Sequence, residues 1–418
     1  MNALSIWQRN ERPTVNSHYS SLTKADGISA ARLCLLFYLL MLLLSITYVF
    51  VNRELNGDFF GVPLSISFLD FGLVSVMSLA PYLVGYQIYK WFTRCAPAPN
   101  VNVSNSMLGI TFFAVTLWFI FLAVQYGVGV LGTNIFEPPP GFLQLVIQIT
   151  NRINPFYLGA FFIVGYQGSK KTLVVGILLL VTLGLLRAGL GVFVYVFLAL
   201  IIRNHKIFLE GLRRHFFKFV LALGIIPVAA SGVSQLYDLR SELRDAQSLT
   251  SGLSGAEVVA GRLAGRLSSV SNTAFIFQTS NLFESYARTL DPWYFQRQAL
   301  APLFGVGIMP ENTPERLLIN AEGGNLFDVS FMTGVPGNLM LSWFINPLVT
   351  LTNIVTIILT LWLGFFFANR LNIPYRNEVC FMLTLYPLSS GVANEFTFIP
   401  VTMFALIILF SVIKLFRI

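Results

Sequence analysis

The stretch ARLCLLFYLLMLLLSITYVFV, residues 31–51, is almost entirely apolar and is long enough to cross a lipid bilayer as one helix. A bilayer core about 30 Å thick requires about 20 apolar residues at about 1.5 Å per residue. Residues 1–30 are polar and of mixed charge, and they lack the pattern of a cleaved signal peptide. The sequence therefore predicts a polar cytoplasmic N-terminus over 1–30, followed by an uncleaved signal anchor.

Apolar runs of this kind recur along the chain. Of its 418 residues, 55% are hydrophobic and 11% are charged, whereas soluble domains carry about 25% charged residues. This composition predicts an all-α fold, a polytopic transmembrane helical bundle with about ten spans. Seven spans are expected within 31–236 and three within 346–418, at 31–51, 65–89, 107–130, 142–167, 172–186, 188–202, 217–236, 346–369, 378–393 and 396–413.

The basic residues indicate which side of the membrane each loop faces. With the N-terminus in the cytoplasm, short basic connections such as Lys170/Lys171 and Arg370/Arg376 all become cytoplasmic, and the opposite short loops contain one base, Arg53. The net charge of +8 is then explained by membrane topology rather than by affinity for nucleic acid. We expect a multi-pass membrane protein with both termini in the cytoplasm.

Residues 237–345 form the one large connection, which this topology places on the periplasmic side. Turn signals interrupt it, and it contains no continuous span. Within 256–274, apolar residues recur at helical spacing, for example at Val259, Leu263 and Leu267. This periodicity predicts an amphipathic helix that lies on the membrane or caps the bundle.

The segment 172–203 is too long for one ordinary span, because its 32 residues would form a helix of about 48 Å. A break at Arg187 would divide it into two short helices. The sequence LLRAGLG around this arginine predicts a recessed hairpin that holds a guanidinium below the membrane surface.

The two kinds of cation are placed differently. The topology puts all seven lysines in the cytoplasm, whereas the external and embedded cations are arginines. Arginine offers a planar fork of donors that binds phosphate or carboxylate at two points. Arg262 and Arg266 lie four residues apart on one predicted helix face, so both could reach one pyrophosphate.

These considerations select two groups of candidate residues. The candidates for catalysis are Arg187, Arg262, Arg266, Glu322 and Asp328, and the candidates for substrate binding are Arg152, Arg240, Arg244, Arg288, Arg297, Tyr286 and Trp293.

Each candidate also has a structural explanation. The loop contains ten acids that could pair with its arginines, and Arg187 could extend to the membrane interface. Arg152 could satisfy a hydrogen bond between helices. Glu322 and Asp328 could cap helices, and the aromatic residues could form an interfacial belt. Gly261 and Gly265 are best explained by close helix packing.

Cysteine and histidine suggest no cofactor. Cys34, Cys95 and Cys380 are widely spaced, which indicates neither a disulfide framework nor a metal site. All three histidines fall on the cytoplasmic side. We therefore expect neither a metal ion nor another cofactor.

The chain resembles the oligosaccharide repeat-unit polymerases of O-antigen and capsule synthesis, the Wzy type. Three local features carry the resemblance: LLRAGLGVF at 185–193, the arginines Arg240 or Arg244 followed by Arg262 or Arg266, and GGNLFDVSFMTGVPGNL at 323–339. Pro336 departs from the pattern of the last run.

The resemblance implies a metal-independent glycosyltransferase of the bacterial inner membrane, in contact with membrane lipid. Its substrates would be polyprenyl-pyrophosphate-linked oligosaccharides. It also implies a chain-length regulator and a flippase as partners. An O-antigen ligase is disfavoured because those enzymes use an external histidine. A lipid-linked oligosaccharide flippase or transporter is disfavoured because the sequence shows no internal repeat. A lipid-phosphate-sugar glycosyltransferase is disfavoured by the short first external loop.

Overall fold

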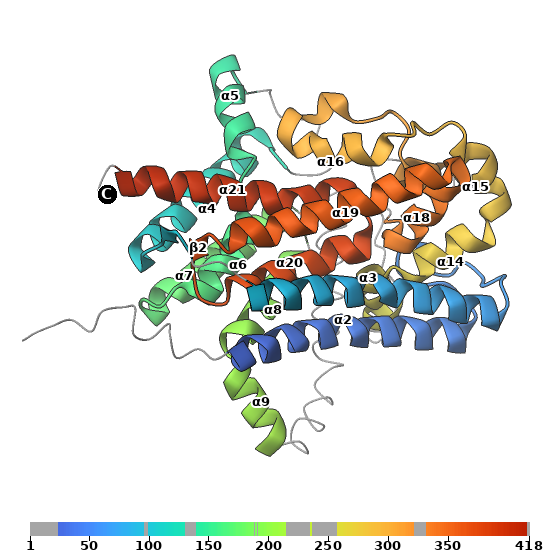
Figure 1. The fold of residues 1–418 in the computed structure, drawn as a ribbon, viewed down its shortest axis with the longest axis horizontal. Helices are drawn as coiled ribbons and strands as arrows, with labels where there is room; N and C mark the ends of the chain where they lie inside the picture. The colour runs from blue at the N-terminus through green and yellow to red at the C-terminus, as the bar shows by residue number, and fades with distance from the viewer. Residues whose placement is uncertain are drawn as a thin grey trace, which may run out of the picture.

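The computed structural model describes residues 24–95, 99–129, 139–187, 189, 191–214, 235, 257–321 and 332–415. These residues are almost entirely helical (Figure 1). The elements of the bundle, listed in chain order, are α2 (Lys24–Asn52), η1 (Gly57–Phe59), α3 (Phe68–Cys95), β1 (Val101–Asn102), α4 (Asn105–Tyr126), α5 (Gly141–Thr150), α6 (Pro155–Gly165), α7 (Lys170–Leu186), α8 (Gly191–Arg203), α9 (His205–Arg214), α19 (Pro347–Ala368), β2 (Leu371–Asn372), α20 (Arg376–Ser390) and α21 (Ala393–Leu415).

The remaining elements belong to the long connection before α19. They are η3 (Val258–Leu263), α13 (Ala264–Ser268), α14 (Val270–Gln278), α15 (Ser280–Ala287), α16 (Tyr294–Phe304), η4 (Val306–Ile308), α17 (Pro314–Ala321) and α18 (Gly334–Ile345).

The protein is an α-helical membrane protein. Among the described residues, five helices are long and apolar enough to cross a membrane: α2, α3, α4, α19 and α21. A sixth span is formed if α8 and α9, which meet at a bend of 80°, are counted as one. The five long helices coincide with predicted spans.

Of the other predicted spans, 172–186, 188–202 and 378–393 correspond to the short helices α7, α8 and α20. The run 142–167 is divided into α5 and α6, because the Asn154 side chain accepts a hydrogen bond from the Phe156 N–H and Pro155 begins a new helix. The run 378–393 corresponds to α20, which has only 15 residues. Most of 217–236 lies outside the described residues.

The break at Arg187 is confirmed. α7 ends at Leu186 with Arg187 as its C-cap, and α8 begins at Gly191. At about 1.5 Å per residue, 17 and 13 residues make helices of roughly 26 Å and 20 Å, both shorter than a bilayer core.

α20 is the central helix of the bundle. It contacts α2, α3, α6, α8, α13, α18, α19 and α21 (Figure 1). All of its residues from Asn377 to Leu385 are buried. Neighbouring helices therefore shield most of α20 from lipid.

The two ends of the bundle can be told apart by their contacts. At one end, which we call the strand end, β1 pairs in parallel with β2. At the other end, the loop end, η1 contacts α13 and α14.

The described lysines gather at the strand end, at the beginnings of α2 and α7, in α9 and near the ends of α3 and α21. This asymmetry agrees with the positive-inside rule if the strand end faces the cytoplasm.

The expectation for 256–274, an amphipathic helix that lies on the membrane or caps the bundle, holds for its helical structure, but the segment does not lie on the surface. This segment forms η3, α13 and the start of α14, and every residue from Leu267 to Ile276 is buried. Its polar residues face protein: the Asn56 N–H donates to Ser271 Oγ, and Asn56 Nδ2 donates to the Ala260 carbonyl. Small side chains and these hydrogen bonds allow the segment to enter the bundle.

Two glycines make this entry possible. A Cβ atom at Gly265 would lie 2.3 Å from the backbone nitrogen of Gly57, and one at Gly261 would lie 2.3 Å from the ring of Phe60. The packing explanation for these glycines is therefore confirmed.

We expect Gly265→Ala to destabilise the protein by about 1–3 kcal/mol, because its clash is with backbone that cannot rotate away. Gly261→Ala should cost less, since the Phe60 ring can move. Gly72→Ala in α3 is the control, because its new Cβ meets nothing within 4 Å. Thermal unfolding in detergent measures all three, and an equal midpoint for Gly265→Ala and Gly72→Ala would contradict the expectation.

Candidate functional site

Arg266 is held by the first loop of the chain. Its Nε donates to Asp58 Oδ1 at 2.6 Å, and the two side chains are 17% and 1% exposed. Asp58 Oδ2 also accepts from Asn272 Nδ2 at 2.9 Å and from the Met332 N–H at 3.2 Å. The carboxylate of Asp58 thus joins three separate segments at the loop end.

Arg262 reaches the same loop. Its guanidinium lies 4.5 Å from the centre of the Phe60 ring, and its Nη1 lies 3.4 Å from the Gly57 carbonyl. Both arginines of GRLAGR therefore contact residues 57–60, which gives each a structural role in addition to any contact with a ligand.

Three polar residues near the centre of the bundle are only half-buried: Arg266, Tyr386 and Glu395. Tyr386 is the one residue of α20 from Asn377 to Ser390 that is not fully buried. Arg266, Asp58 and Glu395 all act electrostatically on the Tyr386 hydroxyl, which shows that the four groups share one neighbourhood. We call this group of neighbouring, partly accessible polar residues, Arg266, Tyr386 and Glu395, the polar chamber.

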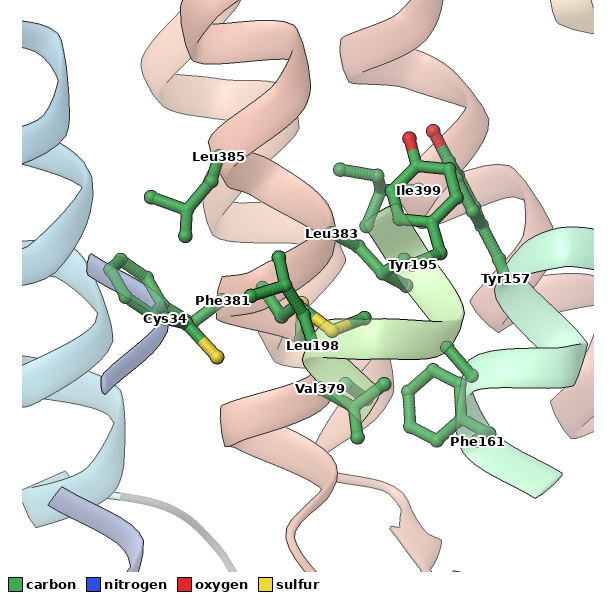
Figure 2. Close-up of a cluster of buried hydrophobic side chains, with 14 of the residues drawn as sticks. Cys34, Tyr157, Phe161, Tyr195, Leu198, Val379, Phe381, Leu383, Leu385 and Ile399 are labelled. Atoms are coloured by element: carbon green, nitrogen blue, oxygen red, sulfur yellow. The ribbon is translucent and has the colours of Figure 1, made fainter. Parts of the chain in front are cut away.

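Tyrosines from two short helices reach the chamber. Tyr157 of α6 and Tyr195 of α8 make an edge contact with ring centres 5.9 Å apart, and Tyr195 makes a similar contact with Tyr386 at 6.2 Å. Figure 2 shows the two hydroxyls side by side, both pointing in the direction in which α20 runs from Val379 to Leu385. They therefore point toward the loop end.

The first turn of α21 supplies further polar groups. The carboxylate of Glu395 accepts a short hydrogen bond from Ser390 Oγ. Asn394 Oδ1 and Thr397 Oγ1 are buried and have no hydrogen-bond partner among the described residues. Phenols, carboxylates, amides and a guanidinium are the groups that bind hydroxyl-rich ligands such as sugars, and a carboxylate can also accept a proton.

An apolar groove of about 560 Å³ lies on the other side of α20. Its walls come from α3, α18 and α19, and it includes Met77, Val84, Leu339, Trp343, Ile357 and Leu388. A smaller hollow of about 280 Å³, formed by Trp91, Trp362 and neighbours, shares Ile358 with it and extends it toward the strand end.

The groove and the chamber are separated by a single helix edge. Leu388 lines the groove, while the next residues face inward: Ser389 Oγ donates to the Leu267 carbonyl at 2.6 Å, and Ser390 Oγ donates to Glu395. A long apolar chain and a polar head can therefore bind the same protein on adjacent faces of α20.

The two embedded arginines lie apart from Arg266. The Arg187 guanidinium lies 4.7 Å from the centre of the Phe119 ring, and its buried Nε has no hydrogen-bond partner within the described ranges. Arg152 follows α5, and its carbonyl accepts from Thr402 Oγ1 at 3.4 Å. Both arginines flank one apolar cluster that includes Phe119, Ile147 and Leu183.

The remaining candidates lie on or near the surface, or outside the described residues. Arg288, Tyr286 and Trp293 are exposed. Arg297 pairs with Asp291 at 2.5 Å and donates to the Ile308 carbonyl at 3.1 Å, which gives it a structural role. The candidates outside the described residues are Arg240, Arg244, Glu322 and Asp328.

Two carboxyl groups of the long connection have shifted pKa values in opposite directions. Burial raises the pKa of Asp291, but the Trp293 N–H and Arg297 outweigh it, so that its pKa is lowered. Burial raises the pKa of Glu315 in α17, because the opposing hydrogen bonds and the charge of Arg316 are too weak to compensate.

Sequence reasoning missed Asp58, Tyr386 and Glu395 as site residues. Asp58 was visible as one of only two acids in a short loop, and Glu395 as an acid between two apolar runs. Within the described part of the chain, no three His, Cys, Asp or Glu side chains are grouped as metal ligands.

Comparison of the chain with models of known protein families, with curated proteins and with solved structures gives no match. The function must therefore be inferred from the residues of the protein itself.

We expect Asp58→Ala to lower the free energy of unfolding by about 3–5 kcal/mol, because it leaves Arg266 without its buried counter-ion. The matched control is Asp291→Ala, which breaks a more exposed pair worth at most about 1 kcal/mol. Denaturant or thermal unfolding in detergent compares the two. Equal destabilisation would show that the Asp58 pair has no special structural weight.

Proposed function

We propose that this protein polymerises oligosaccharide repeat units that are carried on polyprenyl pyrophosphate, forming an O-antigen or capsule-type polysaccharide at the periplasmic face of the bacterial inner membrane. The observation that carries the proposal is the apolar groove placed directly beside the polar chamber. A lipid-linked glycan is a substrate that needs both surfaces. An ordinary soluble substrate would use only the chamber.

The pyrophosphate is assigned to the embedded arginines. A buried cation without a counter-ion is costly, so such a residue is expected to meet an anion. Arg266 and Arg297 already have acid partners, whereas no ion pair is described for Arg187 or Arg152 within the described ranges. Fixed guanidinium donors would stabilise the charge that develops on the leaving pyrophosphate.

The proposal includes the topology predicted from the sequence. Ten spans with both termini in the cytoplasm would place the lysine-rich strand end inside and the chamber near the outer face. A flippase would then deliver the lipid-linked units, and a chain-length regulator would contact the polymerase. An O-antigen ligase is less well supported, because those enzymes use an external histidine and all three histidines of this chain fall on the side predicted to be cytoplasmic.

A flippase or transporter is the second candidate function. It is favoured by the interruptions between α5 and α6 and between α7 and α8, because broken helices commonly surround transport sites. A transport assay with fluorescent lipid-linked sugars in vesicles, run beside an elongation assay, separates the two functions.

We expect Arg187→Ala to reduce elongation of lipid-linked repeat units by roughly 10²–10³-fold, as is typical when a donor to developing negative charge is removed. Arg187→Lys should recover only part of the rate, because lysine lacks the planar fork. Arg297→Ala serves as the control. Gel analysis of products from purified protein in nanodiscs measures the rate, and full elongation by folded Arg187→Ala would refute the pyrophosphate assignment.

A bulky residue in the groove should weaken binding of the lipid carrier. Ala80 lines the groove, whereas Val76, one turn earlier on α3, is exposed and does not line it. Ala80→Trp should raise KM roughly tenfold for a long polyprenyl carrier. The tryptophan would displace about two CH₂ groups of the carrier from the groove, and losing their burial at about 0.8 kcal/mol each weakens binding by about that factor. KM for a short-chain carrier should change little. Val76→Trp is the control, and equal KM values for the two variants would exclude the groove as the lipid site.

A further inference from the structure

Glu395 is the one carboxylate placed at the border of the chamber without a paired cation among the described residues. It lies on the first turn of α21 and is half-buried, and its carboxylate is oriented by Ser390 Oγ. The other chamber carboxylate, Asp58, is occupied by Arg266, Asn272 and the Met332 N–H. Of the two, only Glu395 keeps an oxygen available for a ligand.

The groups that face Glu395 come from every side of the bundle. Its charge acts on the hydroxyls of Tyr38, Tyr157, Tyr195 and Tyr386, from α2, α6, α8 and α20. Glu315 of α17 acts on Glu395 as a second acid. These neighbours are phenols and one buried carboxyl, and the chamber cation Arg266 is paired with Asp58 instead of Glu395. Such a carboxylate is suited to take up a proton.

The first turn of α21 also contains two buried polar atoms without a partner among the described residues. Asn394 Oδ1 and Thr397 Oγ1, on either side of Glu395 in the chain, are buried without partners in the described structure. A sugar hydroxyl could supply the missing hydrogen bonds, and burying such atoms without a partner costs free energy.

We propose that Glu395 accepts the proton of the acceptor sugar, a role that rests on the polymerase function proposed above. The acceptor hydroxyl oxygen forms a bond to the anomeric carbon of the donor glycan. The bond between that carbon and the phosphate oxygen breaks, and its electron pair leaves with polyprenyl pyrophosphate. The hydroxyl proton passes to the carboxylate of Glu395. Ser390 orients the carboxylate, and the leaving pyrophosphate is the group assigned above to the embedded arginines.

The test uses the full chain in nanodiscs with a polyprenyl-pyrophosphate-linked repeat unit. Glu395→Gln should lower the elongation rate roughly 10²–10⁴-fold, the usual effect of removing a general base. Binding of the lipid-linked donor should be unchanged. Glu395→Asp keeps the carboxylate and should retain part of the rate. Glu284→Gln, on the exposed face of α15, is the control and should elongate normally.

The pH dependence separates a proton acceptor from a structural residue. Wild-type elongation should fall as the pH is lowered and Glu395 becomes protonated, and Glu395→Gln should lose this fall in its residual rate. If Glu395→Gln does not fold, Glu395→Asp tests the proposal instead. Elongation by Glu395→Asp that still falls at low pH supports the proposal, and a folded but inactive Glu395→Asp variant overturns it.

The two proposals fail in different ways. Full elongation by folded Glu395→Gln overturns the role of Glu395 and leaves the polymerase function standing. If wild-type protein produces no elongation from the lipid-linked unit, the polymerase function fails, and the role of Glu395 fails with it.

Discussion

The ion pair between Arg266 and Asp58 determines how the rest of the protein is arranged. It joins the first loop after α2 to a segment more than 200 residues later in the chain. The two backbones can approach because Gly57 and Gly265 meet without side chains between them. This contact brings the long connection into the bundle instead of leaving it on the surface. The chamber, bordered by α13, α20 and α21, exists because that segment is inserted.

Much of the helical architecture could be predicted from the sequence. Hydropathy summed over 20 or more residues is a strong signal, so the five long spans were located correctly. The break at Arg187 was also predictable, since one uninterrupted helix would have been too long. The expected number of about ten spans is not confirmed, because only five described helices, or six with the bent pair, are long and apolar enough to cross a membrane. Short helices such as α6 and α20 are shielded by neighbouring helices, and their sequences do not reveal that protection.

The site was harder to predict than the fold because its contacts are distant in sequence. The spacing of apolar residues in 256–274 suggested an amphipathic helix that lies on the membrane or caps the bundle, and it indicated no partners for the serine and asparagine residues between them. Their partners, Asn56 and Asp58, lie far away in the chain, and pairing with them removes the need for water. Glu395 was overlooked for a similar reason: an acid in a two-residue turn suggests exposure, and only the packing of α20 against α21 encloses it.

The arginines of the protein differ in whether an acidic side chain lies beside them. Arg266 and Arg297 are matched to acids, so their placement is explained by folding alone. Arg187 packs against the Phe119 ring, a contact that offers a partial substitute for an anion at modest energy. A protein that only needed to fold would gain by replacing such an arginine with an apolar residue. Folding alone therefore explains the placement of Arg266 and Arg297 but not that of Arg187.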